Sequence, residues 1–145
     1  MVTLATVDER PTAVMTATTT WDKLPVLWPQ LLGEVHAIVR WAGSTGRPGR
    51  NVLLYRDDQP RVEVGVELDQ PAHFDGRLTR SHLPGGTVAT VVHHGPPAGL
   101  FAAHEEIRDF CWGQRLRLAG PRWEVYGHPP GDGSHPVIEI FYLVA

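Results

Sequence analysis

Alternating apolar and polar residues predict a strand over positions 61–69. Successive side chains of a strand point to opposite faces of a sheet, so the apolar residues of this segment share one face. The other face carries Glu63 and Glu67, which we expect to be solvated. Further strands are predicted where β-branched and aromatic residues cluster between turns, at residues 12–20, 51–55, 87–93, 122–126 and 137–144.

Two other segments place their apolar residues at helical spacing. The first runs from Trp28 to Ala42, with Asp22 and Pro25 as start signals, and it tolerates Pro29 only in its first turn. The second helix is predicted from Leu100, with an apolar stripe that includes His104 and reaches Cys111, and with Gly120 and Pro121 as its stop. The 15 glycines and 13 prolines fit short elements joined by sharp turns.

The predicted elements occur in the same order twice, which indicates an internal duplication. Each helix ends near a tryptophan, Trp41 or Trp112, and the strand that follows it ends in a tyrosine, Tyr55 or Tyr126. We therefore predict an α+β fold of two βαββ units with antiparallel sheets around a pseudo-twofold axis. Both helices would lie on one side, and the seam between the units would form a central ligand cleft.

These units set the expected domain boundaries. Residues 1–11 are predicted to be a lead-in to a single domain at 12–145. Repeat one covers about 12–69 and repeat two about 83–145, while the role of residues 70–82 stays open.

Composition excludes several classes of protein. Of the 145 residues, 42% are hydrophobic and 20% are charged, which argues against disorder and against a membrane span. A net charge of −3 argues against direct nucleic-acid or membrane binding. The first ten residues show no signal-peptide pattern, so a cytoplasmic protein is expected.

Two glutamates within predicted strands are the first candidates for chemistry. Glu124 shares a face with Tyr126, and Glu139 shares a face with Phe141. Each carboxylate either lies on an exposed face or points into a pocket, where it could bind a cation or act as an acid or base. The two could flank one cavity, or they could be ordinary alternating strand residues.

The chain has five tryptophans, which fit either core packing or an aromatic pocket wall. Trp28 lies on the apolar stripe of the first helix and is expected in the core. Trp21, Trp41 and Trp112 are the tryptophans expected at the seam. Trp123 adjoins Glu124 but points to the other face of its strand.

Other candidate sites are weaker. The histidines show no metal-ligand spacing, and a single cysteine, Cys111, forms neither an intrachain disulfide nor a multi-thiolate site. We therefore expect no metal and no cofactor. A haem-binding alternative would use His36, His93 or His104 as an axial ligand.

Several short segments in the second half resemble the GyrI-like small-molecule-binding family, also called the bacterial transcription activator effector-binding domain. These segments are Val88–Pro96, the helix up to Trp112, Gly120–Tyr126 and Val137–Leu143. The family's strand ends in His-x-Gly-Pro-Tyr, whereas this chain has Pro97 in place of the aromatic residue. Phe101 could supply the missing aromatic wall.

The resemblance implies a stand-alone protein that captures lipophilic, planar or cationic drug-like compounds in an aromatic pocket with an acidic base. It makes Glu124 the pocket acid and Glu139 the second acidic candidate. The full set of expected ligand-binding residues is Trp21, Trp41, Tyr55, Phe101, Trp112, Glu124, Tyr126, Glu139 and Phe141.

Two other functions fit the same resemblance. Some family members are similar to hydrolases that open the cyclopropane of DNA-alkylating natural products, which would make Glu124 and Tyr126 catalytic. A further alternative is an effector-binding regulator or a partner of a topoisomerase, with an unknown protein partner.

Overall fold

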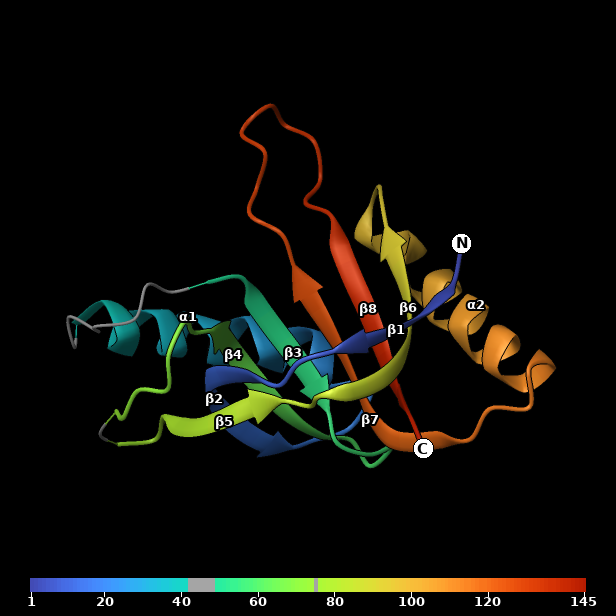
Figure 1. Cartoon of the computed structure of the whole chain (residues 1–145). Helices are drawn as coiled ribbons and strands as arrows, with labels where there is room; N and C mark the ends of the chain where they lie inside the picture. Colours follow the sequence, from blue (N-terminus) through green and yellow to red (C-terminus); the bar gives the residue numbers. More distant parts are fainter. Residues whose placement is uncertain (42–48, 75) are drawn as a thin grey trace.

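The computed structural model describes residues 1–41, 49–74 and 76–145, without the side chain of Trp41. Within this part, the chain forms eight β-strands, two α-helices and one short 3₁₀ helix (Figure 1). The strands are β1 Thr3–Val7, β2 Arg10–Thr18, β3 Asn51–Tyr55, β4 Arg61–Glu67, β5 Thr79–Leu83, β6 Gly86–His93, β7 Leu118–Tyr126 and β8 Ile138–Val144. The helices are α1 Leu24–Trp41, the 3₁₀ helix Pro97–Gly99 and α2 Leu100–Gly113. No helix in the described ranges is long and apolar enough to span a membrane.

The strand order of the antiparallel sheet is symmetric. It reads β1-β6-β8-β7-β3-β4-β2-β5, and exchanging the halves (β1 with β5, β6 with β2, β8 with β4, β7 with β3) reproduces it. The predicted α+β duplication is therefore present, and each unit is ββαββ rather than βαββ. The added strand of each half pairs with the other half, β1 with β6 and β5 with β2.

This exchange of strands corrects two expectations. Residues 1–11 are not a loose lead-in, because β1 and the start of β2 lie in them. The unassigned segment at 70–82 contains most of β5, which pairs with β2 from Val14 to Arg10. Both edge strands are short and have few large apolar residues, so the sequence pattern gave only a weak signal for a strand at either place.

The two halves meet along β3 and β7. Leu53 faces Glu124 in this pair, and Tyr55 faces Arg122. The offset that aligns Tyr55 with Tyr126 in the duplication also aligns Leu53 with Glu124. Leu53 and Glu124 are therefore both equivalent in the duplication and paired in the sheet, which places the pseudo-twofold axis between them.

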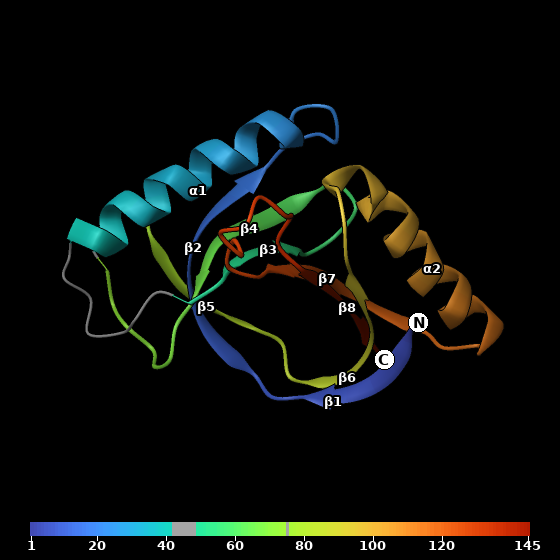
Figure 2. The ribbon, with the colours of Figure 1, turned by 90° about the horizontal axis from the view of Figure 1, so that it is seen from above.

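Both helices cover the same face of the sheet (Figure 2). Helix α1 packs its buried Leu31, Val35 and Val39 against β2, β3 and β4, and α2 packs Ala103, Ile107 and Cys111 against β6 and β8. The opposite face buries a third apolar cluster, which includes Val52, Leu54, Val88, Trp123 and Val125. The β1–β2 and β5–β6 connections pass over this second face, so the middle of the sheet is covered on both sides.

Coverage of both faces explains why Glu63 and Glu67 are not solvated as expected. Each is 3% exposed. Glu63 accepts a hydrogen bond from the Ser81 hydroxyl at 2.6 Å and pairs with Arg56 at 2.9 Å. Glu67 pairs with Arg50 at 2.9 Å, so both buried carboxylates have basic partners.

The first helix also begins earlier than expected. It starts at Leu24, which places Pro29 in the second turn rather than the first. Proline there removes one backbone hydrogen bond of the helix. Packing of the α1 stripe on the sheet outweighs this loss.

Gly65 of β4 pairs with Val14 of the neighbouring strand β2, and the close approach of the two backbones there is testable. A Cβ on Gly65 would lie 1.9 Å from the carbonyl oxygen of Ala13. Gly65→Ala is therefore expected to lower the free energy of unfolding by about 1–3 kcal/mol, measured by urea denaturation.

Gly33 in α1 provides the matched control, because a Cβ there meets nothing within 4 Å. Gly33→Ala should raise stability by about 0.5–1 kcal/mol through helix propensity. Equal effects of the two substitutions would contradict the close approach of β2 and β4.

Candidate functional site

A cavity of about 410 Å³ opens on the helix-covered face, at the seam between the two halves. Helix α2 forms one wall, strands β3 and β7 form the floor, and Trp21 closes the side between β2 and α1. We call this space the seam cavity. Its lining residues are Trp21, Tyr55, Asp58, Leu100, Phe101, His104, Arg108, Arg122 and Glu124.

The carboxylate of Glu124 is the buried acid of this cavity, and the residue is 1% exposed. It accepts hydrogen bonds from the Tyr126 hydroxyl at 2.6 Å and from His104 Nε2 at 2.6 Å. The Tyr55 hydroxyl makes longer contacts of 3.4 and 3.5 Å with its two oxygens. A buried carboxylate needs such donors, because without them its loss of hydration would be uncompensated.

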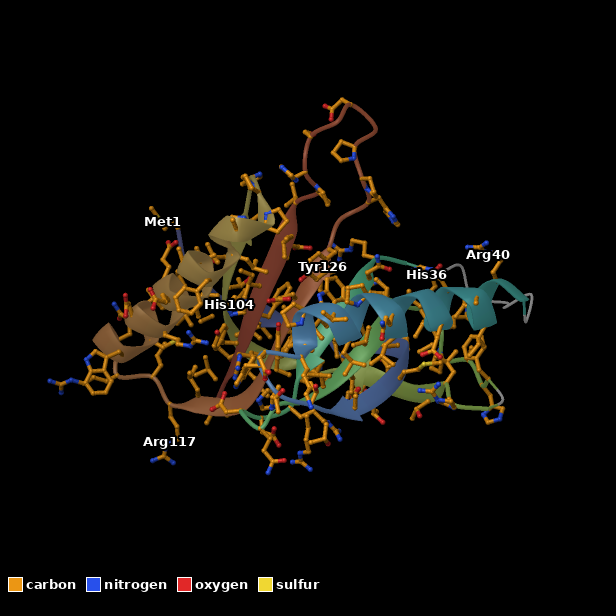
Figure 3. The ribbon with its side chains drawn as sticks, turned by 180° about the vertical axis from the view of Figure 1, so that it is seen from behind. Met1, His36, Arg40, His104, Arg117 and Tyr126 are labelled. Carbon is orange, nitrogen blue, oxygen red and sulfur yellow. The ribbon has the colours of Figure 1, made fainter. Side chains whose placement is uncertain are left out.

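His104 links Glu124 to β8. Its Nδ1 lies 2.6 Å from the Tyr142 hydroxyl, while Nε2 faces the carboxylate. A carboxylate only accepts, so Nε2 carries a proton, and in the neutral ring Nδ1 accepts the hydrogen bond of Tyr142. Tyr142, His104 and Glu124 thus form one chain of hydrogen bonds between β8, α2 and β7. Figure 3 shows His104 on the inner side of α2 and Tyr126 between the two helices.

The tyrosines around Glu124 are held in their neutral form. Burial, followed by the negative charge of Glu124, raises the pKa of both Tyr55 and Tyr126 well above the usual value. Burial also raises the pKa of Tyr142. All three phenols therefore stay hydrogen-bond donors at neutral and moderately alkaline pH.

Arg122 brings a positive charge to the same cavity. It is 8% exposed, and its guanidinium donates to Asp58 Oδ1 at 2.8 Å. The guanidinium carbon lies 5.0 Å from the ring centre of Tyr55 and 5.5 Å from that of Trp21. Trp21 in turn donates its indole N–H to the carbonyl oxygen of Asp58 at 3.2 Å, which ties the β3–β4 turn to the cavity wall.

Four of the predicted ligand-binding residues line the seam cavity, namely Trp21, Tyr55, Phe101 and Glu124. Tyr126 lies beside it, bonded to Glu124 and stacked on Trp28 at 5.2 Å between ring centres. Trp112 is 86% exposed and does not reach the cavity. The side chain of Trp41 lies outside the described residues.

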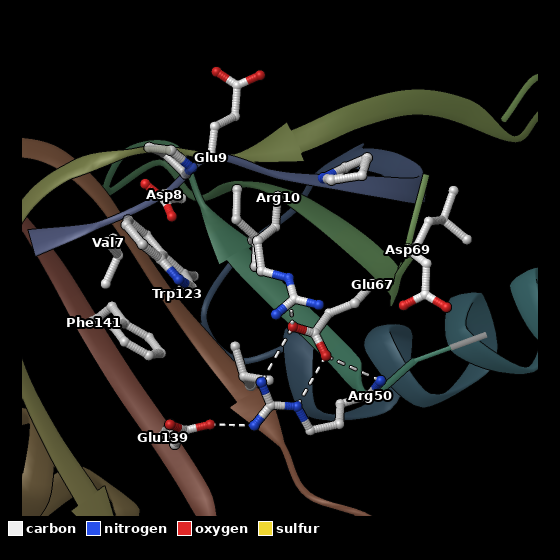
Figure 4. A pocket seen from close by; sticks show the side chains of 15 residues that line it. Val7, Asp8, Glu9, Arg10, Arg50, Glu67, Asp69, Trp123, Glu139 and Phe141 are labelled. Carbon is white, nitrogen blue, oxygen red and sulfur yellow. Dashed lines mark hydrogen bonds and ion pairs between the residues drawn. The ribbon is translucent and has the colours of Figure 1, made fainter. Parts of the chain in front are cut away.

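Glu139 and Phe141 lie on the opposite face of the sheet, so the two glutamates do not flank one cavity. Glu139 pairs with Val125 across β7 and β8, which turns it away from Glu124. It lines a second cavity of about 550 Å³ together with the stacked rings of Trp123 and Phe141. In this cavity Arg50 is paired with both Glu67 and Glu139 (Figure 4).

Sequence reasoning missed three side chains that the structure brings together around Glu124 and the seam cavity. Arg122 was identifiable, because it shares its strand face with Glu124 and Tyr126. From the sequence, His104, on the apolar stripe of its helix, was named only as a possible haem ligand. A polar residue on such a stripe is a signal of a buried hydrogen-bond partner. Tyr142 carried no local signal, because only tertiary packing brings it to His104.

The sequence matches no protein-family model and no curated protein. Its structure nevertheless resembles solved structures along its whole length. The crystal structure of the EcmrR C-terminal domain superposes with a TM-score of 0.81 at 18% identity, covering 100% of this chain and 97% of that one. SAV2435 bound to tetraphenylphosphonium has a TM-score of 0.68 at 12% identity, covering 100% and 94%. A hydrolase from Listeria innocua has a TM-score of 0.61 at 13% identity, covering 99% and 91%.

These likenesses establish the fold. The chain has the α+β architecture of the EcmrR C-terminal domain, which is the GyrI-like fold that its motifs predicted. The chain also matches EcmrR in the cryo-EM structure of an EcmrR–DNA complex. The match covers 57% of that EcmrR chain, so it is a match to part of a longer protein.

The raised tyrosine pKa values predict an unusual alkaline titration, because the chain has three tyrosines and all three are affected. Above about pH 10 the unfolded chain loses phenolic protons that the native protein keeps. Stability should therefore fall as pH rises, by roughly 1.4 kcal/mol per pH unit for each of Tyr55 and Tyr126, with a further loss from Tyr142. Tyrosinate absorbance of the native protein should stay low until it unfolds.

The control is the same titration in denaturant, where all three tyrosines should ionise near their ordinary pKa. A native protein that ionises one tyrosine or more near pH 10 would contradict the arrangement around Glu124.

Proposed function

We propose that this chain is an effector-type domain that captures flat, lipophilic small molecules in the seam cavity. The observation that carries this proposal is the contrast between the cavity's mouth and its floor. Phe101 and Trp21 stand at the mouth with exposed fractions of 69% and 47%, while Glu124 lies fully buried beneath them. Exposed aromatic rings around a concave site offer apolar area that a ligand would cover.

The size of the cavity supports a ligand of this kind. Its volume of about 410 Å³ falls within the range of small-molecule sites. The aromatic rings come from three separate elements, namely the β2–α1 corner, β3 and α2. A flat molecule inserted between them would contact both halves of the fold. EcmrR and SAV2435, the latter bound to tetraphenylphosphonium, share this fold and so support ligand binding as its use here.

Trp21 and Trp112, both exposed, provide a direct test. Binding of acridone, a flat neutral dye, should quench tryptophan fluorescence. Trp21→Ala should weaken binding roughly three- to tenfold through lost aromatic contact, as measured by calorimetry. Trp112→Ala is the matched control and should leave the affinity unchanged.

Equal loss in the two variants, or none in Trp21→Ala, would place the dye elsewhere on the protein. Both substitutions remove one tryptophan, so the comparison also corrects for the change in total fluorescence.

A second candidate function is hydrolysis of cyclopropane-bearing compounds. The observation in its favour is the long hydrogen bond between Tyr55 and Glu124. The Tyr55 hydroxyl lies 3.4 and 3.5 Å from the two carboxylate oxygens, and both residues line the cavity. A water inserted there could give its proton to the carboxylate while its oxygen bonds to a ring carbon. The strained C–C bond would then break, with its electrons moving to a conjugated carbonyl of the substrate. A hydrolase from Listeria innocua shares the fold, which supports testing this reaction.

Glu124→Gln separates binding from hydrolysis. The amide keeps the shape of the side chain but cannot take up the proton, so turnover should fall at least a hundredfold while binding persists. Ring-opened product is measured by mass spectrometry. Absence of product from the unmodified protein across a panel of such compounds would eliminate the hydrolase function and leave capture intact.

A further inference from the structure

Aromatic side chains in and beside the seam cavity already surround a cation, the protein's own Arg122. Its guanidinium carbon lies 5.0, 5.5 and 5.9 Å from the ring centres of Tyr55, Trp21 and Tyr142. Several aromatic faces around one point form the arrangement that attracts ligand cations. In this chain that position is filled from β7, beside Glu124 in the same strand.

Several contacts keep Arg122 in this position. The side chain is 8% exposed and donates to Asp58 Oδ1 at 2.8 Å. Asp58 is held by the β3–β4 turn, in which the neighbouring Asp57 accepts backbone N–H groups of Gln59 and Arg61. A ligand cation would have to displace Arg122 from its contacts with three aromatic rings.

The charge balance of the wall also disfavours a second cation. Arg108 on α2 places its guanidinium 5.8 Å from the Tyr142 ring centre, so Tyr142 contacts two arginines. Both line the cavity together with Asp58 and Glu124. Glu124 is already engaged by His104 and Tyr126 at 2.6 Å each, and Asp58 is largely in solvent, where an ion pair is weak.

The Arg122 guanidinium also has N–H groups without a hydrogen-bond acceptor among the described residues. Among the described residues, Asp58 is the one hydrogen-bond acceptor that its guanidinium meets, whereas a guanidinium carries five N–H groups. Arg122 lines the cavity, so its remaining N–H groups can donate to an oxygen of a ligand bound there. A planar guanidinium favours a carbonyl or a carboxylate lying in its own plane.

We propose that Arg122 determines the ligand class of this site: it occupies the cation position and selects flat aromatic compounds with an oxygen acceptor, neutral or anionic, over cationic ones. This inference rests on the proposed capture of small molecules in the seam cavity. It departs from the sequence-based expectation of cationic ligands, in which Glu124 attracts the positive charge.

Three probes with the same three-ring frame test this selection. Acridone is neutral with a carbonyl oxygen, acridine-9-carboxylate is anionic, and 9-aminoacridine is cationic at neutral pH. The unmodified protein should bind acridone and acridine-9-carboxylate at least tenfold more tightly than 9-aminoacridine, measured by calorimetry. Arg122→Met removes the charge but keeps a long apolar side chain, and it should bind 9-aminoacridine at least tenfold more tightly than the unmodified protein does.

Two further variants serve as controls. Arg122→Lys keeps the charge and should keep the discrimination against 9-aminoacridine, with weaker binding of acridine-9-carboxylate. Arg117→Met makes the same chemical change far from the seam cavity (Figure 3), so it should leave all three affinities unchanged. It also corrects for the altered net charge of the protein.

Each outcome decides between the hypotheses. If the unmodified protein binds 9-aminoacridine as tightly as acridone, or if Arg122→Met binds the three probes in the original order, the role of Arg122 is overturned while small-molecule capture stands. If none of the three probes binds the unmodified protein, the proposed function itself fails. If Arg122→Met does not fold, the affinity ratio in the unmodified protein and in Arg122→Lys decides the question.

Discussion

The carboxylate of Glu124 is buried at the centre of the molecule, and this burial constrains everything around it. A buried charge is stable only with donors, and here they come from separate parts of the chain: Tyr55 in β3, His104 in α2 and Tyr126 in β7. Tyr142 in β8 then fixes the other side of the His104 ring. The positions of three strands and one helix are therefore coupled through a single carboxylate, on the face that the seam cavity opens to.

The duplication explains why this site is both central and asymmetric. Leu53 and Glu124 are equivalent residues of the two units, and they face one another across β3 and β7. A single carboxylate on a pseudo-twofold axis breaks the symmetry, because its counterpart is apolar. The duplication thus provides the symmetric sheet and the seam between its halves. Divergence at the Leu53–Glu124 pair placed the carboxylate in the second unit only.

The sheet also separates two polar groups of residues, so Glu124 and Glu139 do not flank one cavity, which was one of the two arrangements that the sequence left open. Glu124 and Arg122 lie on the helix-covered face, whereas Glu139, Glu67 and Arg50 lie on the opposite face. Period-two alternation assigned Glu63 and Glu67 correctly to one common face. It wrongly made that face solvated, because the segments that cover it, around the β1–β2 and β5–β6 connections, come from distant parts of the chain.

The sequence by itself determined the α+β duplication, both helices, most strands, and the shared strand face of Glu124 and Tyr126. These are local properties, since they follow from residue periodicity, turn residues and strand alternation within a few positions. Tertiary structure alone decided that β1 and β5 exchange between the halves, that Trp112 is exposed, and that Tyr142, His104 and Arg122 converge on the seam. Those contacts join residues far apart in the chain, and the pairing of a buried polar group depends on its neighbours in space rather than on its neighbours in sequence.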